Sequence, residues 1–308
     1  MLQNLQVVAG SVLTLFLLMS VGFFFGKRGL LSEDALPQLS CLLLYVVTPA
    51  IMITSFETER TAESTALLLA STAALVGTYG LYMLLAAFLF RRRPPEQRGV
   101  LRFAAIYGNT GFMGLPLIQS VLGEDAMLVA VLALAVFNVA TWTHGVGLIG
   151  GRAHLSPQKV ILNPGVLGFA AGLLLFLTGW RLPGPVDAAV GYLGSLNTPL
   201  AMVIIGGQMA QTNFGAAFRD KALYLLSALK LLGIPLLTAL VLLPFHLDPV
   251  AFTALVILSA CPTAGATSLF SQSMGGDTDL AARQITLSTL LCVVTLPLMA
   301  VLAQTLAG

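Results

Sequence analysis

The sequence contains few charged residues. Asp, Glu, Lys and Arg make up 9% of its 308 residues, whereas apolar types make up 57%. Soluble domains carry about 25% charged residues, because polar groups have to cover a surface that faces water. The mean hydropathy is +0.92. These values exclude a water-soluble fold and predict an all-α polytopic membrane protein in a lipid bilayer.

Cysteines are also scarce, and so are the motifs of several functional classes. Cys41, Cys261 and Cys292 lie singly in apolar runs, a spacing that indicates neither a disulfide framework nor a zinc site. No phosphate-binding loop, Ser-His-Asp constellation or basic domain occurs in the sequence. We therefore expect no enzyme, no cofactor or metal, no ATP hydrolysis and no nucleic-acid partner.

Ten apolar runs are long enough to cross a bilayer, which takes about 17 residues or more. In hydrocarbon the backbone has to satisfy its own hydrogen bonds, so continuous apolar runs predict helices. The runs are Leu5–Phe25, Ala35–Phe56, Thr65–Phe90, Val100–Leu122, Ala126–Ile149, Val160–Trp180, Val186–Ala210, Ala222–Leu243, Pro249–Met274 and Leu280–Leu306.

Lysine and arginine are distributed unevenly between the connecting segments. Only Arg60 and Arg181 lie in one alternate set of segments, and Lys230 lies inside a run. Cytoplasmic loops carry the excess of positive charge, so an even count of spans places both termini outside. The cations of the other set are Lys27, Arg28, Arg91, Arg92, Arg93, Arg98, Arg102, Arg152, Lys159, Arg219, Lys221 and Arg283.

The two halves of the chain repeat the same order of features. Thr48-Pro49 in the second run matches Thr198-Pro199 in the seventh, and Gln119 in the fourth matches Gln272 in the ninth. Five spans per half is an odd number, so the second half has to enter the membrane from the opposite side. The sequence therefore predicts an inverted repeat of residues 1–150 and 151–308, an arrangement that secondary transporters commonly use.

The fourth and ninth runs are poor continuous helices. Gly108, Gly111, Gly114 and Pro116 interrupt the fourth, whereas Pro262 and Gly265 interrupt the ninth. Interrupted spans at matching places in two halves indicate a transporter binding site, because they expose backbone groups near the midplane. The alternative is a pair of kinked helices packed through small residues. Polar side chains near the breaks are Asn109, Thr110, Gln119, Thr263, Thr267, Ser268, Ser271 and Gln272.

Lys230 is the only formal charge deep inside a run. It follows Lys221 by nine residues, which is about 13 Å along a helix. An ammonium at that depth is costly and favours a function, such as holding an anion, replacing a bound cation or titrating during transport. The alternative is a lysine that extends along the helix to the interface. His144 and Asn138 share one side of the fifth run and could face the same cavity.

Two glycine pairs fit the small-residue pattern of helix packing in membranes. They are Gly22 with Gly26 and Gly168 with Gly172. Glycines four residues apart allow two helix backbones to approach closely.

The fourth run carries a family resemblance. Gly108-Asn109-Thr110-Gly111-Phe112-Met113-Gly114-Leu115-Pro116, together with Thr48-Pro49 and the five-plus-five layout, resembles the auxin efflux carrier family. The bacterial members include malonate and malate permeases, and the plant members are the PIN-type auxin carriers. The resemblance covers essentially the whole chain, and it implies a bacterial cytoplasmic membrane as the location.

The resemblance implies a ten-helix fold similar to bile-acid sodium symporters and sodium/proton antiporters. Spans one, two, six and seven would form a scaffold and a homodimer interface, and spans three to five and eight to ten a moving transport domain. The fourth and ninth spans would cross at their breaks, beside the substrate, and access would alternate by an elevator movement. The ninth break has no asparagine equivalent to Asn109, so the two half-sites differ chemically.

The expected function is secondary transport or uniport of a small organic anion, a carboxylate. A sodium-coupled symporter for bile-acid-type substrates and a membrane sensor that binds without transport remain alternatives. The ion-coupling candidates, for sodium or a proton, are Gln119, His144, Lys230 and Gln272. The substrate-binding candidates are Asn109, Thr110, Gly111, Gly114, Pro116, Asn138, Lys230, Pro262, Thr263, Gly265, Thr267 and Ser268.

Overall fold

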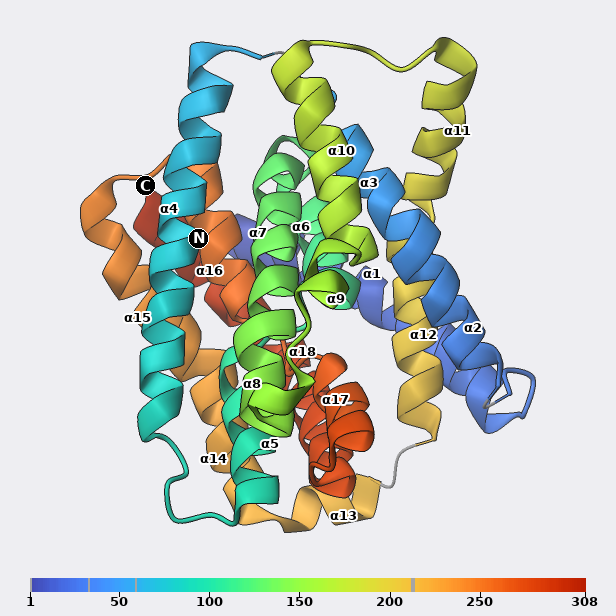
Figure 1. Ribbon diagram of the computed structural model, residues 1–308, viewed down its shortest axis with the longest axis vertical. Helices are drawn as coiled ribbons and strands as arrows, with labels where there is room; N and C mark the ends of the chain where they lie inside the picture. The colour runs from blue at the N-terminus through green and yellow to red at the C-terminus, as the bar shows by residue number, and fades with distance from the viewer. Residues whose placement is uncertain (1, 33, 59, 212–213) are drawn as a thin grey trace.

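A computed structural model of the chain describes residues 2–32, 34–58, 60–211 and 214–308, with the side chains of residues 2–7, 152, 214, 216 and 219 outside the description. The described chain is helical, apart from one isolated antiparallel bridge (Figure 1). The helices are α1 (Leu2–Lys27), α2 (Ala35–Leu42), α3 (Thr48–Ser55), α4 (Ala62–Phe88), α5 (Pro95–Ile106), α6 (Leu115–Leu122), α7 (Met127–Ala140), α8 (Val146–Gly150), α9 (Pro157–Ile161), α10 (Pro164–Thr178), α11 (Gly184–Ser195), α12 (Asn197–Ala210), α13 (Phe214–Arg219), α14 (Lys221–Ala228), α15 (Ile234–Leu242), α16 (Pro249–Ser259), α17 (Ala266–Met274) and α18 (Thr278–Ala307). Three short 3₁₀ turns connect them, at Glu124–Ala126, Arg152–His154 and Leu243–Phe245.

Seven helical stretches of the described chain are long and apolar enough to cross a membrane. They are Val8–Lys27, Ala35–Ser55, Ala62–Phe88, Glu124–Gly150, Gly184–Ala210, Lys221–Phe245 and Thr278–Ala307, and three shorter apolar helices cover Thr110–Leu122, Pro164–Thr178 and Pro249–Ser259. The prediction of an all-α polytopic membrane protein is confirmed. The expectation that all ten runs exceed the spanning length is not, because the fourth and ninth divide at their breaks and the sixth is shorter.

Local capping explains where several helices begin and end. The sixth run was predicted from Val160, but α10 begins at Pro164, because the Asn163 side chain accepts hydrogen bonds from the backbone N–H groups of Gly165 and Val166. The third run was predicted to reach Phe90, but α4 ends two residues earlier, since Phe90 has a φ of 52°. Capping side chains and positive φ values are local signals that hydropathy does not report.

Four wide π-helical turns interrupt the spans, and three of them precede a proline. These three are Leu43–Val47 before Pro49, Thr110–Gly114 before Pro116, and Leu229–Gly233 before Pro235. The proline ring clashes with the carbonyl group four residues earlier, and a wider turn moves that carbonyl aside. The fourth turn, Thr141–Gly145, lies between α7 and α8. The prolines therefore bend these spans without ending them.

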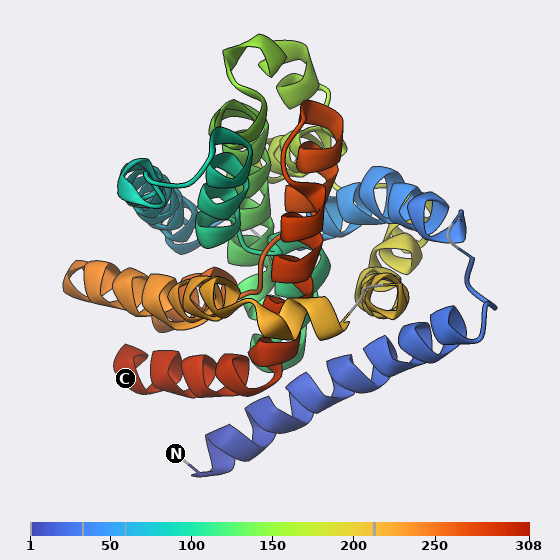
Figure 2. The same cartoon turned by 90° about the horizontal axis from the view of Figure 1, so that it is seen from below.

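Glycines allow two pairs of helices to pack closely. α1 lies along α12 (Figures 1 and 2), where an added methyl group at Gly22 would overlap the Val203 carbonyl oxygen. α10 lies against α3, where a methyl group at Gly168 would stand 2.6 Å from the Pro49 Cα atom. Both glycine pairs named from the sequence therefore lie at close helix contacts, as that pattern predicts.

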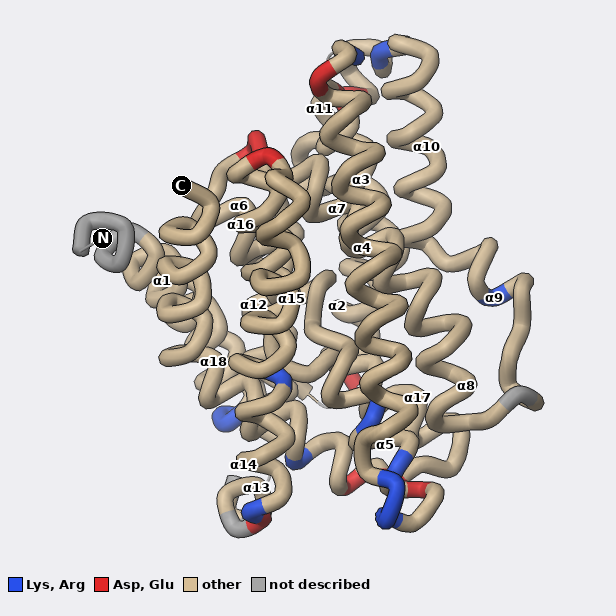
Figure 3. The backbone as a smooth tube through the Cα atoms, turned by 90° about the vertical axis from the view of Figure 1, so that its left-hand side faces the viewer, with Lys and Arg blue, Asp and Glu red and all other residues tan. Residues whose placement is uncertain are grey.

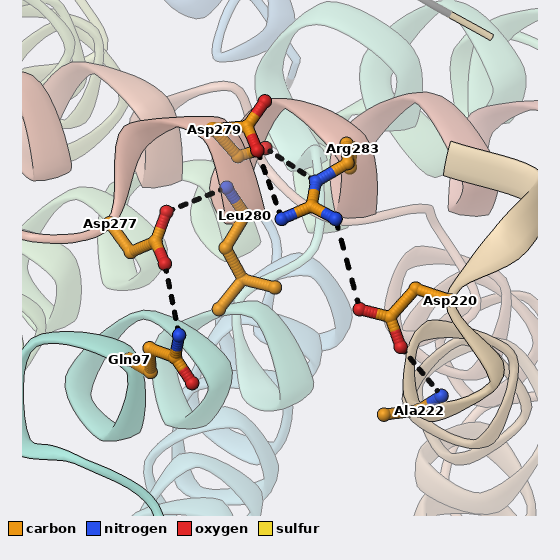
Figure 4. A network of polar contacts seen from close by, with 7 residues as sticks. All are labelled: Gln97, Asp220, Ala222, Asp277, Asp279, Leu280 and Arg283. Carbon is orange, nitrogen blue, oxygen red and sulfur yellow. Dashed lines mark hydrogen bonds and ion pairs between the residues drawn. The ribbon is translucent and has the colours of Figure 1, made fainter. Parts of the chain in front are cut away.

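Most lysines and arginines lie toward the end of the molecule that holds α5 and α13 (Figure 3). Helix α9, which carries Lys159, lies nearer mid-height (Figure 3), and the side chains of Arg152 and Arg219 are outside the described residues. At the charged end, Arg283 pairs with Asp279 at 2.9 Å and Asp220 at 3.9 Å (Figure 4). These contacts join α18 to the start of α14.

A second link at the same end joins α5 to the start of α18. The Gln97 amide donates to the Asp277 carboxylate at 3.2 Å, and Asp277 caps α18 by accepting from the backbone N–H of Leu280 (Figure 4). The charged end of the bundle is therefore held by polar contacts between three helices.

Arg60 and Arg181, the two cations in the connecting segments at the other end of the molecule, donate hydrogen bonds to backbone carbonyl groups. Arg60 donates to the Leu177 carbonyl at 2.8 Å, near the end of α10, and Arg181 donates to the Glu57 carbonyl. Positive side chains near a helix C-terminus are favourable because the last carbonyls carry partial negative charge. These exceptions to the charge asymmetry therefore have a structural reason.

Glu57, between α3 and α4, lies in surroundings that raise the pKa of its carboxyl group. Burial raises the pKa of its carboxyl group, and the neighbouring Asp187 carboxylate raises it further, against a weaker opposing effect of Arg181. The buried Oε1 atom of Glu57 has no hydrogen-bond donor among the described residues. A hydrogen bond between the Glu57 and Asp187 carboxyl groups needs a proton on one of them. A raised pKa means that the folded state favours the protonated form.

We expect the melting temperature to rise as the pH falls from 7 through this raised pKa, and to level off below the ordinary pKa of glutamate. Glu57→Gln should raise the melting temperature at pH 7 by a few degrees and reduce its pH dependence. Asp125→Asn, at an exposed carboxylate, is the control and should leave the pH profile unchanged. Thermal unfolding from pH 4.5 to 8 measures this, and an unaltered profile in Glu57→Gln contradicts the assignment.

Candidate functional site

The breaks in the fourth and ninth predicted spans meet at one point of the fold. α5 ends at Ile106 and the next turn begins at Thr110, while α16 ends at Ser259 and α17 begins at Ala266. The two unwound segments are joined by a single antiparallel bridge, with Gly108 opposite Thr263.

Backbone hydrogen bonds across this crossing replace those that the interrupted helices cannot make. The Asn109 N–H donates to the Pro262 carbonyl at 2.7 Å, and the Ala264 N–H donates to the Tyr107 carbonyl at 3.0 Å. Buried backbone groups need partners. The two breaks therefore stabilise each other, and neither would be expected to persist alone at this depth.

Polar side chains of α18 hold the ninth-span break from behind. Thr263 donates through its N–H to the Ser288 hydroxyl at 3.1 Å and through its own hydroxyl to the Ala104 carbonyl at 3.2 Å. The Gln284 amide donates to Ser227 at 3.2 Å and to Thr263 at 3.4 Å. The side chains of this polar cluster are all fully buried, namely Ser227, Thr263, Gln284 and Ser288. Their hydrogen bonds fix the position of the crossing.

Lys230 lies where the crossing meets the end of α16. Its side chain is 1% exposed, and its ammonium donates to the carbonyl of Ser259, the last residue of α16, at 2.8 Å. A methyl group added at Gly108 would stand 3.0 Å from the Lys230 Nζ atom and 3.2 Å from the Cys261 carbonyl oxygen.

The C-terminal end of a helix carries partial negative charge, so α16 stabilises the Lys230 ammonium electrostatically. The only ion pairs among the described residues belong to Arg283. Among the described residues Lys230 therefore has one carbonyl partner, Ser259, and no carboxylate partner.

A small cavity opens beside Lys230. Its volume is about 30 Å³, which leaves room for about two water molecules. In this conformation the cavity therefore has no room for anything larger than a few water molecules. The polar residues of its lining are Thr78, Tyr79, Tyr82, Thr110, Lys230, Thr238 and Ser259, with Gly108 at the break.

Asn109 lies in the break with its side chain partly exposed. Its Oδ1 atom accepts from the Phe112 N–H at 3.2 Å, which caps the following turn. Its amide nitrogen has no partner among the described residues. The amide N–H groups can therefore donate to a carboxylate without breaking an existing contact.

Comparison with known proteins agrees with this geometry. The profile of the membrane transport protein family, the auxin efflux carrier family, matches residues 7–156 and 153–300. The chain belongs to this family. It is therefore a membrane transporter and not an enzyme.

Relatives of the transporter extend over nearly the whole chain. An "Uncharacterized transporter" of Methanothermobacter thermautotrophicus is 25% identical over 94% of this chain and 97% of its own length. A "Putative malonate transporter" of Rhizobium meliloti is 25% identical over 94% of this chain and 93% of its own length. A shorter match, 36% identical over 32% of this chain and 23% of its own length, is to the human "Sodium/bile acid cotransporter 4".

The transporter brings some of the predicted site residues together and separates others. Asn109, Thr110, Pro262, Thr263 and Lys230 meet at the crossing. Gly114 packs tightly beneath it, since a methyl group there would stand 2.8 Å from Leu258. Gly111 and Pro116 belong to the turn and helix that follow, and Gly265, Thr267 and Ser268 lie where α17 begins.

The predicted ion-coupling glutamines lie away from Lys230 and in unlike surroundings. Gln119 donates to Glu124 at 2.8 Å and accepts from Thr198 at 3.0 Å. Gln272 is exposed on α17. Their equivalent places in the sequence therefore do not give them equivalent contacts.

His144 contacts Tyr107, which belongs to the crossing, whereas the Asn138 side chain lies against α10. Tyr107 donates its hydroxyl to the Ala140 carbonyl at 3.0 Å and contacts the His144 Nδ1 atom at 3.0 Å. The Tyr107 oxygen is then free to accept from an Nδ1–H group, which favours that tautomer. The Asn138 amide lies against Gly165 at the start of α10.

Sequence reasoning missed the aromatic wall of the cavity. Tyr79 stacks on Tyr107 with ring centroids 6.0 Å apart, and the hydroxyl groups of Tyr82 and Thr238 are hydrogen-bonded. One signal was present, since Thr78, Tyr79 and Tyr82 place three hydroxyl groups within five residues of an apolar run. Polar side chains inside a span usually face protein or water-filled space.

Proposed function

We propose that the transporter moves a small organic anion, a carboxylate, across the membrane, and that the anion binds at the crossing. The observation that carries the proposal is the buried Lys230 ammonium, which lies beside both breaks with no carboxylate partner among the described residues. A fixed positive charge at this depth favours a negative substrate. The name of the Rhizobium meliloti relative supports a dicarboxylate such as malonate.

Two groups at the crossing have the chemistry that carboxylate binding needs. The free amide of Asn109 would donate to one carboxylate oxygen, and Lys230 would supply charge, either directly or as an internal counter-ion. Thr110 lines the cavity beside Lys230. In this proposal the crossing recognises the anion, and Tyr79 and Tyr82 limit the size of the space around it.

We further propose an elevator movement of a transport domain against a scaffold. The scaffold would comprise α1, α2–α3, α10 and α11–α12, and the transport domain α4–α8 and α14–α18, as two inverted repeats. Among the described residues, hydrogen bonds between the two parts include that from the Ser11 hydroxyl to the Ser120 carbonyl at 2.8 Å and that from Thr198 to Gln119 at 3.0 Å. A sliding movement would have to break these bonds together with the apolar contacts between the helices.

The distribution of charge supports an orientation. Most lysines and arginines lie toward the end that holds α5 and α13 (Figure 3), and the positive-inside rule assigns such an end to the cytoplasm. Both chain ends would then face outward. Accessibility of a cysteine introduced near residue 95, tested in intact and permeabilised cells, would check the orientation.

Asn109→Ala is expected to reduce malonate uptake into proteoliposomes by about tenfold, because one hydrogen bond to a charged group contributes about 1.5 kcal/mol or more. The melting temperature should fall by only a few degrees, because the side-chain cap on the Phe112 N–H is lost while the Asn109 backbone bond to Pro262 remains. Gln158→Ala, an exposed amide on α9, is the control and should transport normally. Unchanged uptake by Asn109→Ala would show that the substrate binds elsewhere.

The match to the sodium/bile acid cotransporter favours a second candidate, a sodium-coupled symporter with bulkier substrates. Uptake measured with imposed sodium, proton and potassium gradients separates the candidates. Uptake driven by sodium favours the symporter, uptake driven by a pH gradient favours proton coupling through Lys230 or His144, and uptake driven by membrane potential alone favours a uniporter. Binding of the anion without any flux would leave a membrane sensor.

A further inference from the structure

Five arginines gather at the corner between α4 and α5. Arg91, Arg92 and Arg93 follow the end of α4 and are exposed, whereas Arg98 and Arg102 lie on α5. The ion pairs of the described residues involve Arg283 alone among the arginines. Glu96 lies in the same stretch but pairs with none of the five. The corner therefore carries uncompensated positive charge.

The five arginines begin just past the end of α4, next to exposed apolar side chains on that helix. The Arg91 guanidinium lies over the ring of Phe88, 4.6 Å from its centroid. Phe88 is 65% exposed and Leu84 is 64% exposed. Residues four apart lie on one face of a helix, and in a membrane protein an exposed apolar face of this kind contacts acyl chains. Arg91 is therefore placed at headgroup level.

A cavity lies beside the five arginines, so part of their positive charge faces a concave surface. Arg98, Arg102 and one acidic residue, Glu96, line a cavity of about 570 Å³ between α5 and the glycine-rich end of α8. Arg102 is fixed by the carbonyl groups of Leu89 at 2.9 Å and Ala87 at 2.8 Å. Arg91 also donates to the Ala87 carbonyl, at 3.4 Å, and Arg98 lies one turn before Arg102 on α5. An anion placed between these arginines would be stabilised.

We propose that the α4–α5 corner binds the phosphate of an anionic glycerophospholipid, such as phosphatidylglycerol. The phosphate lies between Arg91 and Arg98 at the mouth of the cavity, and the acyl chains lie along Leu84 and Phe88. Basic pockets between helices on one side of the membrane bind anionic headgroups in this way. A zwitterionic lipid gains less, because its own cation meets the arginines, and a soluble phosphate lacks the acyl contact.

Binding of short-chain phosphatidylglycerol to the purified full-length protein, measured by native mass spectrometry, tests the proposal. Phosphatidylcholine and glycerol phosphate are the comparison ligands. One arginine near a membrane surface contributes about fivefold in affinity, so Arg91→Gln with Arg98→Gln should weaken phosphatidylglycerol binding about twentyfold. The same pair changed to lysine should retain most of the affinity, because the charge is kept.

A matched control lies at the end of α1. Lys27 and Arg28 also stand over aromatic rings, at 5.7 Å from the Phe23 centroid and 4.8 Å from the Phe24 centroid. Lys27→Gln with Arg28→Gln should leave phosphatidylglycerol binding within twofold of the wild type. An equal loss in both pairs would overturn the proposal in favour of general surface charge, and equally tight binding of glycerol phosphate would overturn the lipid assignment. If the double glutamine variant does not fold, Arg98→Gln alone should still show about a fivefold loss.

Discussion

Lys230→Met is expected to reduce anion uptake by tenfold to about a hundredfold while the protein remains folded. A charge-assisted hydrogen bond contributes about 1.5–3 kcal/mol, and each 1.4 kcal/mol is a factor of about ten. Methionine fills nearly the same volume, and removing a buried ammonium relieves its desolvation, which offsets the loss of the bond to Ser259. Function and stability should therefore respond differently to this change.

Uptake of radiolabelled malonate into proteoliposomes, with the melting temperature measured in parallel, separates the two effects. Lys221→Met is the matched control, because Lys221 starts the same span but is exposed. It should transport at the wild-type rate. If Lys230→Met transports normally and melts at a lower temperature, the ammonium only neutralises the end of α16, and the anion site lies elsewhere.

Gly206→Ala is expected to be among the most destabilising single methyl additions in the chain. A methyl group at this position of α12 would overlap the Met19 carbonyl oxygen of α1, and the nearby Gly22 makes the reciprocal approach to Val203. The obstacle is backbone, which cannot rotate away as a side chain can. Overpacking typically costs about 1–3 kcal/mol, and we expect the upper end of that range here.

Thermal unfolding in detergent and the monodisperse fraction after size-exclusion chromatography measure this effect. Gly10→Ala is the matched control, since Gly10 lies on α1 with open space around it, and alanine there should stabilise the helix slightly. Equal melting temperatures for the two variants would mean that α1 and α12 do not pack as described. Uptake in surviving Gly206→Ala protein should fall in proportion to folded protein, because the site lies elsewhere.

The two breaks were predictable from the sequence because proline and glycine act locally, whereas their crossing was implied only by the family resemblance. Pro262 cannot donate a helical hydrogen bond wherever the chain folds, and Gly108 tolerates a close neighbour in any context. The same local chemistry predicted the tight contacts of Gly22 and Gly168. Family membership, helical class and the transporter function followed from composition and from the motif around Asn109.

The partners of the site residues were not predictable in the same way. In a membrane protein both the lipid-facing and the core-facing sides of a helix are apolar, so periodicity does not reveal how a helix is rotated. Tyr79 and Tyr82 therefore gave no clear sign that they face Lys230. Gln119 and Gln272 hold matching places in the two halves, yet one is hydrogen-bonded to Thr198 and the other is exposed.

The amino-acid sequence by itself determined that this chain lies in a membrane, where its fourth and ninth spans break and that one lysine lies inside an apolar run. These properties depend on the chemistry of single residues and their neighbours along the chain. The tertiary structure alone decided that the two breaks pair with each other, that Lys230 meets the end of α16, and that α4 closes the cavity. Such contacts join distant segments, and they depend on how each helix is rotated and displaced against the others.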